Sequence, residues 1–243
     1  MSEQGGTFIT FEGIDGCGKS TQVGLLVTAL DELGLDNVHL REPGGTSISE
    51  KIRALLLDPD NLEMRPETEL LLYEASRAQL VRQVIEPALK AGKVVLCDRF
   101  YDSTFAYQAI ARGLGEELVR RSNELGSCGF TPQLTVVFDL DPEVAWSRAT
   151  QGGADRMEAE GLAFQSRVRE GYLRAAELEP WRVVVVDANG TPEQVFSRLV
   201  DTLSGVIPEL ADLDAQAFLA MQADVERAMA DITLSLGQEE TNV

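Results

Sequence analysis

Short apolar runs alternate with segments of helical periodicity along most of the chain. The runs lie at residues 7–11, 38–41, 94–97, 134–138 and 183–186, and their length and composition predict five strands. Between the first two runs, apolar side chains recur at helical spacing, at Val23, Leu26, Val27, Leu30 and Leu33. Strands that alternate with helices predict an α/β fold with a parallel sheet and helices on both faces.

Capping residues and prolines mark where several helices should begin. Ser47 and Glu50 have capping-box spacing and predict a helix to about residue 57, and Thr191 with Gln194 predicts another to about residue 203. Pro66 suits the first turn of a long helix that Pro87 should bend. The remaining helices are expected at about residues 103–112, 116–126, 142–150 and 158–178.

The last part of the chain differs in composition from the rest. Residues 205–243 contain eight acidic side chains and one basic side chain, and no strand-like run. Apolar residues from Phe218 to Ile232 recur at helical spacing. We expect one domain over residues 1–204 and an acidic, helical appendage over residues 205–243.

A glycine-rich stretch between the first strand and the first helix carries the clearest chemical signal. Residues 13–21 match the phosphate-binding pattern G-x-x-x-x-G-K-[ST], in the required order of strand, loop and helix. Backbone N–H groups of such a loop surround phosphate oxygens, and its lysine reaches the terminal phosphates. The predicted triphosphate-binding residues are Gly13, Ile14, Asp15, Gly16, Cys17, Gly18, Lys19, Ser20 and Thr21.

Composition narrows the class of protein. The net charge of −19 argues against nucleic-acid binding, which needs a basic face. No apolar run approaches the ~20 residues that cross a membrane, so we expect no membrane segment, and the polar first residues predict no signal peptide. Three cysteines without metal-type spacing are typical of reduced thiols, and we expect a cytoplasmic location.

Charged side chains collect where the predicted strands end, which is where open parallel sheets bind ligands. Arg41 ends the second strand, Asp98 and Arg99 follow the third, and Asp139 follows the fourth. Ser20 and Asp98 are the candidate magnesium ligands. Asp139 is the rival carboxylate, but Pro142 begins a helix nearby, so Asp139 could equally be a turn or cap residue.

With these residues in place, the chain resembles the bacterial thymidylate kinase family, within the P-loop nucleoside monophosphate kinases. The resemblance covers about residues 7–203 and rests on five motifs, at residues 11–21, 41–46, 71–79, 98–108 and 155–158. It implies a three-layer P-loop NTPase fold with a short lid at about residues 149–161. It also implies Mg²⁺-assisted transfer of the γ-phosphoryl group of ATP to dTMP, which gives dTDP, by a homodimer.

The resemblance further implies a role for each residue of the acceptor pocket. Asp15 would bind the sugar 3′-hydroxyl, and Arg99 would hold the dTMP phosphate with Arg41 and Arg53 nearby. Tyr73 would stack on thymine and Arg77 would reach its O4. The pocket is completed by Ser103, by Thr104 and Gln108, which would read the base edge, and by Tyr107, which would exclude ribonucleotides.

Several of these residues also have a structural explanation. Tyr73 and Tyr107 could be core aromatics with a satisfied hydroxyl group. Arg53 could be a solvated helix residue, and Arg77 could form a surface ion pair with Glu74.

The resemblance assigns phosphoryl-transfer chemistry to Lys19, Arg99 and arginines of the lid. Gly16 stands where some family members carry a catalytic arginine, and members with glycine there use lid arginines instead. Within residues 149–161 there is one arginine, Arg156, and Arg148 directly precedes them. We therefore expect Arg156 to contact the transferred phosphoryl group and Arg148 to support it.

Two other functions are compatible with these motifs. One is a different nucleoside monophosphate kinase or deoxynucleoside kinase, which the base pocket should distinguish. The other is a nucleotide-binding protein that has lost catalysis, but Lys19, Ser20, Asp98 and Arg99 are all present, which disfavours it.

Overall fold

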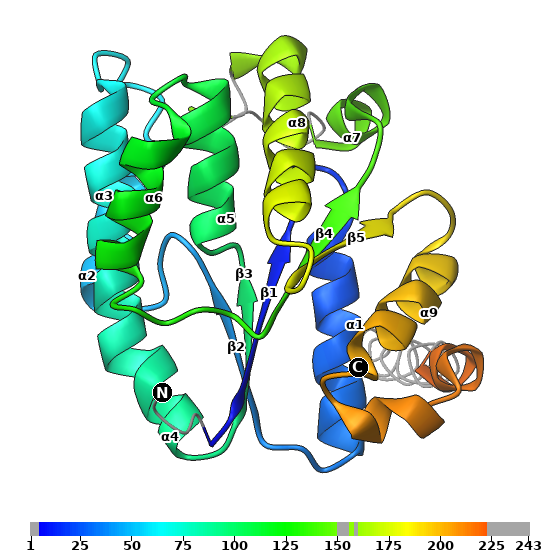
Figure 1. The fold of residues 1–243 in the computed structure, drawn as a ribbon. Helices are drawn as coiled ribbons and strands as arrows, with labels where there is room; N and C mark the ends of the chain where they lie inside the picture. Colours follow the sequence, from blue (N-terminus) through cyan, green and yellow to red (C-terminus); the bar gives the residue numbers. More distant parts are fainter. Residues whose placement is uncertain (1–4, 150–155, 158–159, 223–243) are drawn as a thin grey trace, which may run out of the picture.

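The computed structural model describes residues 5–149, 156–157 and 160–222. Its centre is a five-stranded parallel sheet with the strand order β2-β3-β1-β4-β5 (Figure 1). The strands are β1 Thr7–Glu12, β2 Asn37–Arg41, β3 Val94–Asp98, β4 Leu134–Asp139 and β5 Val183–Asp187. The predicted α/β class and parallel sheet are confirmed.

Side chains of β1 alternate between two apolar clusters, as the pleat of a strand requires. Ile9 and Phe11 belong to a cluster with Leu26 of α1 (Lys19–Glu32) and Leu199 of α9 (Pro192–Leu203). Phe8 belongs to a second cluster, with residues of α3 (Pro66–Leu80) and of the segment that follows it. The sheet is therefore covered on both faces, with α1 and α9 together on one of them (Figure 1).

The remaining helices connect these strands in chain order. They are α2 Ser47–Leu57, α4 Glu86–Lys90, α5 Tyr101–Thr104, α6 Glu116–Gly126, α7 Pro142–Ala149 and α8 Leu162–Leu178. Two π-helical stretches, Val81–Ile85 and Phe105–Ala111, continue α3 and α5. The first lies directly before Pro87, so the expected change in the long helix occurs there as a widened turn.

One predicted capping box and one predicted helix start were wrong, although α2 begins at Ser47 and ends at Leu57 as expected. The N-cap of α2 is Thr46, whose hydroxyl accepts from the Ser49 N–H group, whereas Glu50 binds the Gly45 N–H group and Arg41. Helix α8 begins at Leu162 rather than at residue 158, because Gly161 has a φ of 85°, which is not helical. The capping box of Thr191 and Gln194 is confirmed.

The segment after α9 packs onto the domain. A 3₁₀ turn, Pro208–Asp212, leads into a helix whose described part is residues 215–222. Leu210 and Phe218 belong to the same core cluster as α1 and α9, and the Phe218 ring stacks on that of Phe196 at 5.6 Å. The rest of the predicted appendage, residues 223–243, lies outside the described residues.

Candidate active site

The phosphate loop joins β1 to α1 at the carboxyl end of the central strand. A side chain at Gly13 would lie 2.7 Å from the Phe138 carbonyl oxygen and 2.8 Å from the Cys17 sulfur, so only glycine fits there. Gly18 precedes α1 with a φ of 91°, a left-handed conformation that glycine adopts without strain. The loop thus brings backbone N–H groups and the helix N-terminus to one place, which suits an anion.

Lys19 and Ser20 both contact the carboxylate at the end of β3. The Lys19 Nζ atom lies 2.9 Å from Oδ1 of Asp98, and the Ser20 hydroxyl donates to Oδ2 at 3.3 Å. Lys19 holds the pKa of Asp98 below its usual value although burial alone would raise it. A hydroxyl and an ionised carboxylate side by side are oxygen donors of the kind that Mg²⁺ takes from proteins.

Asp139, the rival carboxylate, has a different partner. Arg169 of α8 binds it with two hydrogen bonds, 2.6 Å from Nε to Oδ1 and 2.9 Å from Nη2 to Oδ2. This bidentate pair satisfies the Asp139 carboxylate within the protein. The contacts therefore favour Asp98 over Asp139 as the carboxylate near the loop.

A cavity opens beside the phosphate loop on the side of α9. Its walls are the loop from Ile14 to Gln22, Arg148 at the end of α7, and the segment after β5 that includes Ala188 and Gly190. The Arg148 side chain is exposed to it. Cys17 is buried, and burial raises the pKa of its thiol, so it has no features of a nucleophile. We call this space the donor cavity.

A second cavity, of about 590 Å³ with its open mouth, lies on the other side of the loop. We call it the acceptor cavity. It brings together the predicted residues Asp15, Arg53, Tyr73, Arg77, Arg99, Ser103, Thr104, Tyr107 and Gln108. Its wall also includes Glu42, Pro43, Leu57, Phe100 and Met157. Asp15 lines both cavities, so they adjoin at the loop.

Arg99 connects this cavity to the phosphate loop. Its φ of 69° is left-handed, which is rare for a residue other than glycine and is found at functional sites. Nη2 binds the Asp15 carboxylate at 2.5 Å, and Nη1 donates to the carbonyl oxygen of Gly13 and the Tyr172 hydroxyl at 3.0 and 2.8 Å. Nη1 also contacts Ser103. Two of the five N–H donors of Arg99, one on Nε and one on Nη2, have no partner among the described residues.

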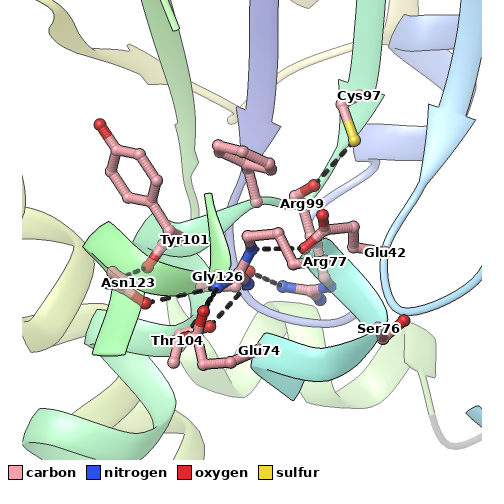
Figure 2. A network of polar contacts seen from close by, with 12 residues as sticks. Glu42, Glu74, Ser76, Arg77, Cys97, Arg99, Tyr101, Thr104, Asn123 and Gly126 are labelled. Carbon is pink, nitrogen blue, oxygen red and sulfur yellow. Dashed lines mark hydrogen bonds and ion pairs between the residues drawn. The ribbon is translucent and has the colours of Figure 1, made fainter. Parts of the chain in front are cut away.

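Arg77 is buried and surrounded by acceptors, rather than forming a surface pair with Glu74 (Figure 2). Nε donates to Glu42 at 2.8 Å, Nη1 donates to Glu74 and Asn123, and Nη2 donates to the Thr104 hydroxyl at 2.7 Å. These bonds use four of its five N–H donors, which leaves one.

Two buried carboxylates, Glu42 and Glu74, pair with the Arg77 guanidinium. Burial raises the pKa of Glu42 to about 8, because Arg77 offsets that burial only in part and Glu74 adds a second negative charge. The other oxygen of Glu42, Oε1, is buried and has no hydrogen-bond partner among the described residues. Arg77 therefore sits in a fixed frame of acceptors in the wall of the acceptor cavity.

The predicted phosphate-side arginines Arg41 and Arg53 differ in position. Arg53 lines the acceptor cavity and donates to the Pro43 carbonyl oxygen at 2.9 Å. Arg41 donates to the same oxygen, but its half-exposed side chain pairs with Glu50 and is not in the cavity wall. The predicted role of Arg41 has no support from this arrangement.

Arg156 lies away from the phosphate loop, against α2 and α3. Its Nε atom donates to the Leu56 carbonyl oxygen at 2.7 Å, and Nη2 pairs with Glu69 at 2.6 Å. The residue is 7% exposed and lines neither cavity. The predicted phosphoryl contact of Arg156 has no support from this position, because Glu69 holds its guanidinium. The other residues of the predicted lid, 150–155 and 158–159, lie outside the described residues.

Sequence reasoning assigned no role to two residues that contact the site, Tyr172 and the strand-end residue Glu12. Tyr172 of α8 reaches Arg99 and Ser103, and Glu12 accepts hydrogen bonds from Ser103 and Phe100. Burial, reinforced by Asp102, raises the pKa of Glu12 to about 7. The position of Glu12 at a strand end was a signal for it. Tyr172 has no local signal, because only packing of α8 beside residues 105–111 brings it near.

Two features are absent from the described residues, a membrane-spanning helix and a cluster of metal-binding side chains. No helix in the described part of the chain is long and apolar enough to cross a membrane. Across residues 5–149, 156–157 and 160–222, no group of three or more histidine, cysteine, aspartate or glutamate side chains could hold a metal ion. An ion at Ser20 and Asp98 would therefore need other ligands, such as nucleotide phosphates and water.

The comparisons with known proteins agree with this geometry. The thymidylate kinase family model matches residues 11–199. A thymidylate kinase of Desulfosudis oleivorans is 51% identical over 207 residues, which cover 82% of this chain and 97% of the relative. One of Symbiobacterium thermophilum is 49% identical over 201 residues, which cover 83% and 94%.

A solved structure supports the same relationship. The crystal structure of thymidylate kinase from Ehrlichia chaffeensis superposes with a TM-score of 0.68 at 32% sequence identity. The match covers 82% of this chain and 98% of that chain. The family model, the relatives and the fold lead to one conclusion: the chain belongs to the thymidylate kinase family.

Proposed function

We propose that this protein transfers the γ-phosphoryl group of ATP to dTMP and releases dTDP and ADP. The observation that carries the proposal is that the donor and acceptor cavities adjoin at Asp15 of the phosphate loop. A triphosphate on the loop and a monophosphate beside Arg99 would place their phosphates next to each other. Phosphoryl transfer asks mainly for such positioning and for positive charge, which Lys19 and Arg99 supply.

The acceptor phosphate would bind Arg99. A guanidinium with two N–H donors left after its protein contacts can hold phosphate oxygens with fixed geometry. Asp15, which now binds Arg99 and the Tyr107 hydroxyl, would accept from the sugar 3′-hydroxyl. Tyr107 would then crowd the sugar 2′ position, and Arg53 would add charge at the mouth.

The acceptor base would lie between Tyr73 and the buried frame of Arg77. The single N–H donor left on Arg77 matches a carbonyl oxygen, such as O4 of thymine, and opposes the amino group of cytosine. Thr104 and Gln108, in the same wall, would contact the neighbouring edge of the base.

Mg²⁺ would bind at Ser20 and Asp98, whose oxygens lie together at the loop. When bound, the ion neutralises charge on the triphosphate. Lys19 now pairs with Asp98 and would turn to the phosphates when the nucleotide arrives.

Arg148 is the arginine that fits the donor side. It lines the donor cavity and is exposed to it, whereas Arg156 is held by Glu69. We therefore assign to Arg148 the positive charge that a catalytic arginine at position 16 supplies in other family members. Arg156 would instead anchor the segment that carries it to α3 through Glu69.

The assembly and location are further parts of the proposal. Exposed apolar side chains lie on three helices that pack together, α2, α3 and α6 (Figure 1): Ile48, Leu55, Leu71, Leu118 and Leu125. A second copy of the chain would cover them, and light scattering of the wild type and of Leu71→Glu tests this homodimer. A cytoplasmic location agrees with the three free cysteines.

A coupled ADP-release assay across dTMP, dUMP, dCMP, UMP and AMP tests the activity. We expect the highest kcat/KM with dTMP, and no turnover of any substrate by Lys19→Met. A higher kcat/KM with a nucleotide that lacks the thymine O4 and N3–H edge would reject the proposal in favour of another nucleoside monophosphate kinase.

A further inference from the structure

Glu69 of α3 is a buried carboxylate at the back of the acceptor cavity. Its side chain is 1% exposed, and it receives hydrogen bonds from three side chains. Gln108 Nε2 donates to Oε1 at 2.9 Å, Arg112 binds both oxygens at 3.2 Å, and Arg156 binds Oε2 at 2.6 Å. Of the three, Gln108 is the one that lines the acceptor cavity.

The charge state of Glu69 decides which end of the Gln108 amide faces it. Burial would raise the pKa of Glu69, but hydrogen bonds from Arg112 and Gln108 outweigh burial and hold that pKa below its usual value. An ionised carboxylate only accepts hydrogen bonds, so the amide nitrogen of Gln108 must turn toward it. The other end, the carbonyl oxygen Oε1, is then left for the cavity.

The surroundings of Gln108 agree with this orientation. The residue is 1% exposed, and its Oε1 atom has no hydrogen-bond partner among the described residues. Unlike Glu42 Oε1, which is buried without a partner, Gln108 Oε1 is not a buried atom. The acceptor is therefore open to the cavity rather than enclosed by protein.

We propose that Glu69 is a positioning residue that sets base specificity by fixing the Gln108 amide with its oxygen toward the substrate. This inference rests on the proposed function. Gln108 then offers an acceptor and Arg77 offers a donor in the same wall. This pair complements a ring N–H group beside a carbonyl, which is the N3–H and O4 edge of thymine and uracil. Cytosine presents an acceptor at N3 and a donor at its amino group, so both contacts oppose it.

The test measures kcat/KM for dTMP and dCMP and takes their ratio. In Glu69→Gln the new amide can donate to Gln108, which allows the Gln108 amide to turn its nitrogen toward the cavity. We expect the dTMP to dCMP ratio to fall by about tenfold or more, since a mismatched buried hydrogen bond discriminates strongly. In a Gln108→Ala background the same substitution should leave the ratio unchanged.

Arg112→Lys is the matched control. It keeps a positive charge beside Glu69 and loses one of the two hydrogen bonds of Arg112, so Glu69 should stay ionised and the ratio should be kept. A wild-type ratio retained in folded, active Glu69→Gln would overturn the inference, as would an equal fall in the ratio in Arg112→Lys. If the wild type does not prefer dTMP at all, the proposed function fails first, and this inference with it.

A second measurement needs no variant, in case Glu69→Gln does not fold. The Gln108 side-chain NH₂ group of the wild type should be protected from hydrogen exchange in ¹⁵N NMR before nucleotide is added, because it binds Glu69. Its exchange should change little when dTMP binds. An unprotected NH₂ group that becomes protected only with dTMP would mean that the nitrogen, not the oxygen, faces the base.

Discussion

The Nη2 atom of Arg99 lies 2.5 Å from Oδ1 of Asp15, which ties the end of β3 to the phosphate loop. Tyr107 donates to the other oxygen of Asp15 at 3.2 Å. Arg99 holds the pKa of Asp15 below its usual value although burial would raise it, so the carboxylate is ionised. The same aspartate faces both cavities, and its partner is the arginine that we assign to the acceptor phosphate.

Arg99→Lys should lower kcat/KM for dTMP by about 10²- to 10³-fold, since removing one positioned donor that stabilises charge in the transition state costs about that much. Lysine keeps the charge but cannot contact Asp15, Gly13 and a phosphate together. Steady-state kinetics with dTMP varied at saturating ATP measures the effect. Arg82→Lys, on an exposed pair with Glu86, is the control and should behave as wild type. Equal kinetics of the two variants would remove Arg99 from the phosphate site.

Arg148→Ala and Arg156→Ala should separate chemistry from anchoring. Arg148 lines the donor cavity, so its loss should lower kcat at saturating ATP and dTMP by about 10³-fold or more. Arg156 forms a buried pair with Glu69, so its loss should cost about 3 kcal/mol of unfolding free energy. Urea unfolding and kcat are measured for both variants. A collapse of kcat in Arg156→Ala with unchanged stability would restore the role that the lid motif suggested.

Local patterns predicted the sheet and the loop because both are encoded by neighbouring residues. Apolar runs mark the strands, and the phosphate-loop motif is contiguous in the sequence, from Gly13 to Ser20. The cluster around Glu69 joins residues 69, 108, 112 and 156, and nothing in sequence spacing links them. A place within a motif does not guarantee a place in the site. Asp102 lies between Arg99 and Ser103 in the sequence, but it binds Arg182 and Thr135 and does not line the acceptor cavity.

Glu12 should make stability depend on pH. Its pKa is about 7 in the folded chain and 4.5 in a free side chain, so the folded state keeps a proton that the unfolded state releases. The contribution of Glu12 to the unfolding free energy should therefore fall as pH rises from about 4.5 to about 7, by up to about 3 kcal/mol, and should stay constant above that. Urea unfolding of wild type and Glu12→Gln at constant ionic strength measures the difference. The variant should show the shallower fall, and two parallel curves would mean that Glu12 titrates normally.

Phe218→Ala tests whether the acidic segment after α9 is a separate appendage or part of the domain core. The ring is 4% exposed and stacks on Phe196 of α9, in the cluster that also holds α1. Removing a buried phenylalanine costs about 3–5 kcal/mol through lost burial and the cavity left behind. We expect a loss at the lower end, because this side chain lies at the edge of the core. Met221→Ala is the control, since Met221 is exposed on the same helix and should change stability little. Urea unfolding of the full chain measures both. A single transition that shifts only in Phe218→Ala would mean that the segment folds together with the sheet. If both variants unfold like wild type, the residues after 204 do not contribute to the stability of the domain.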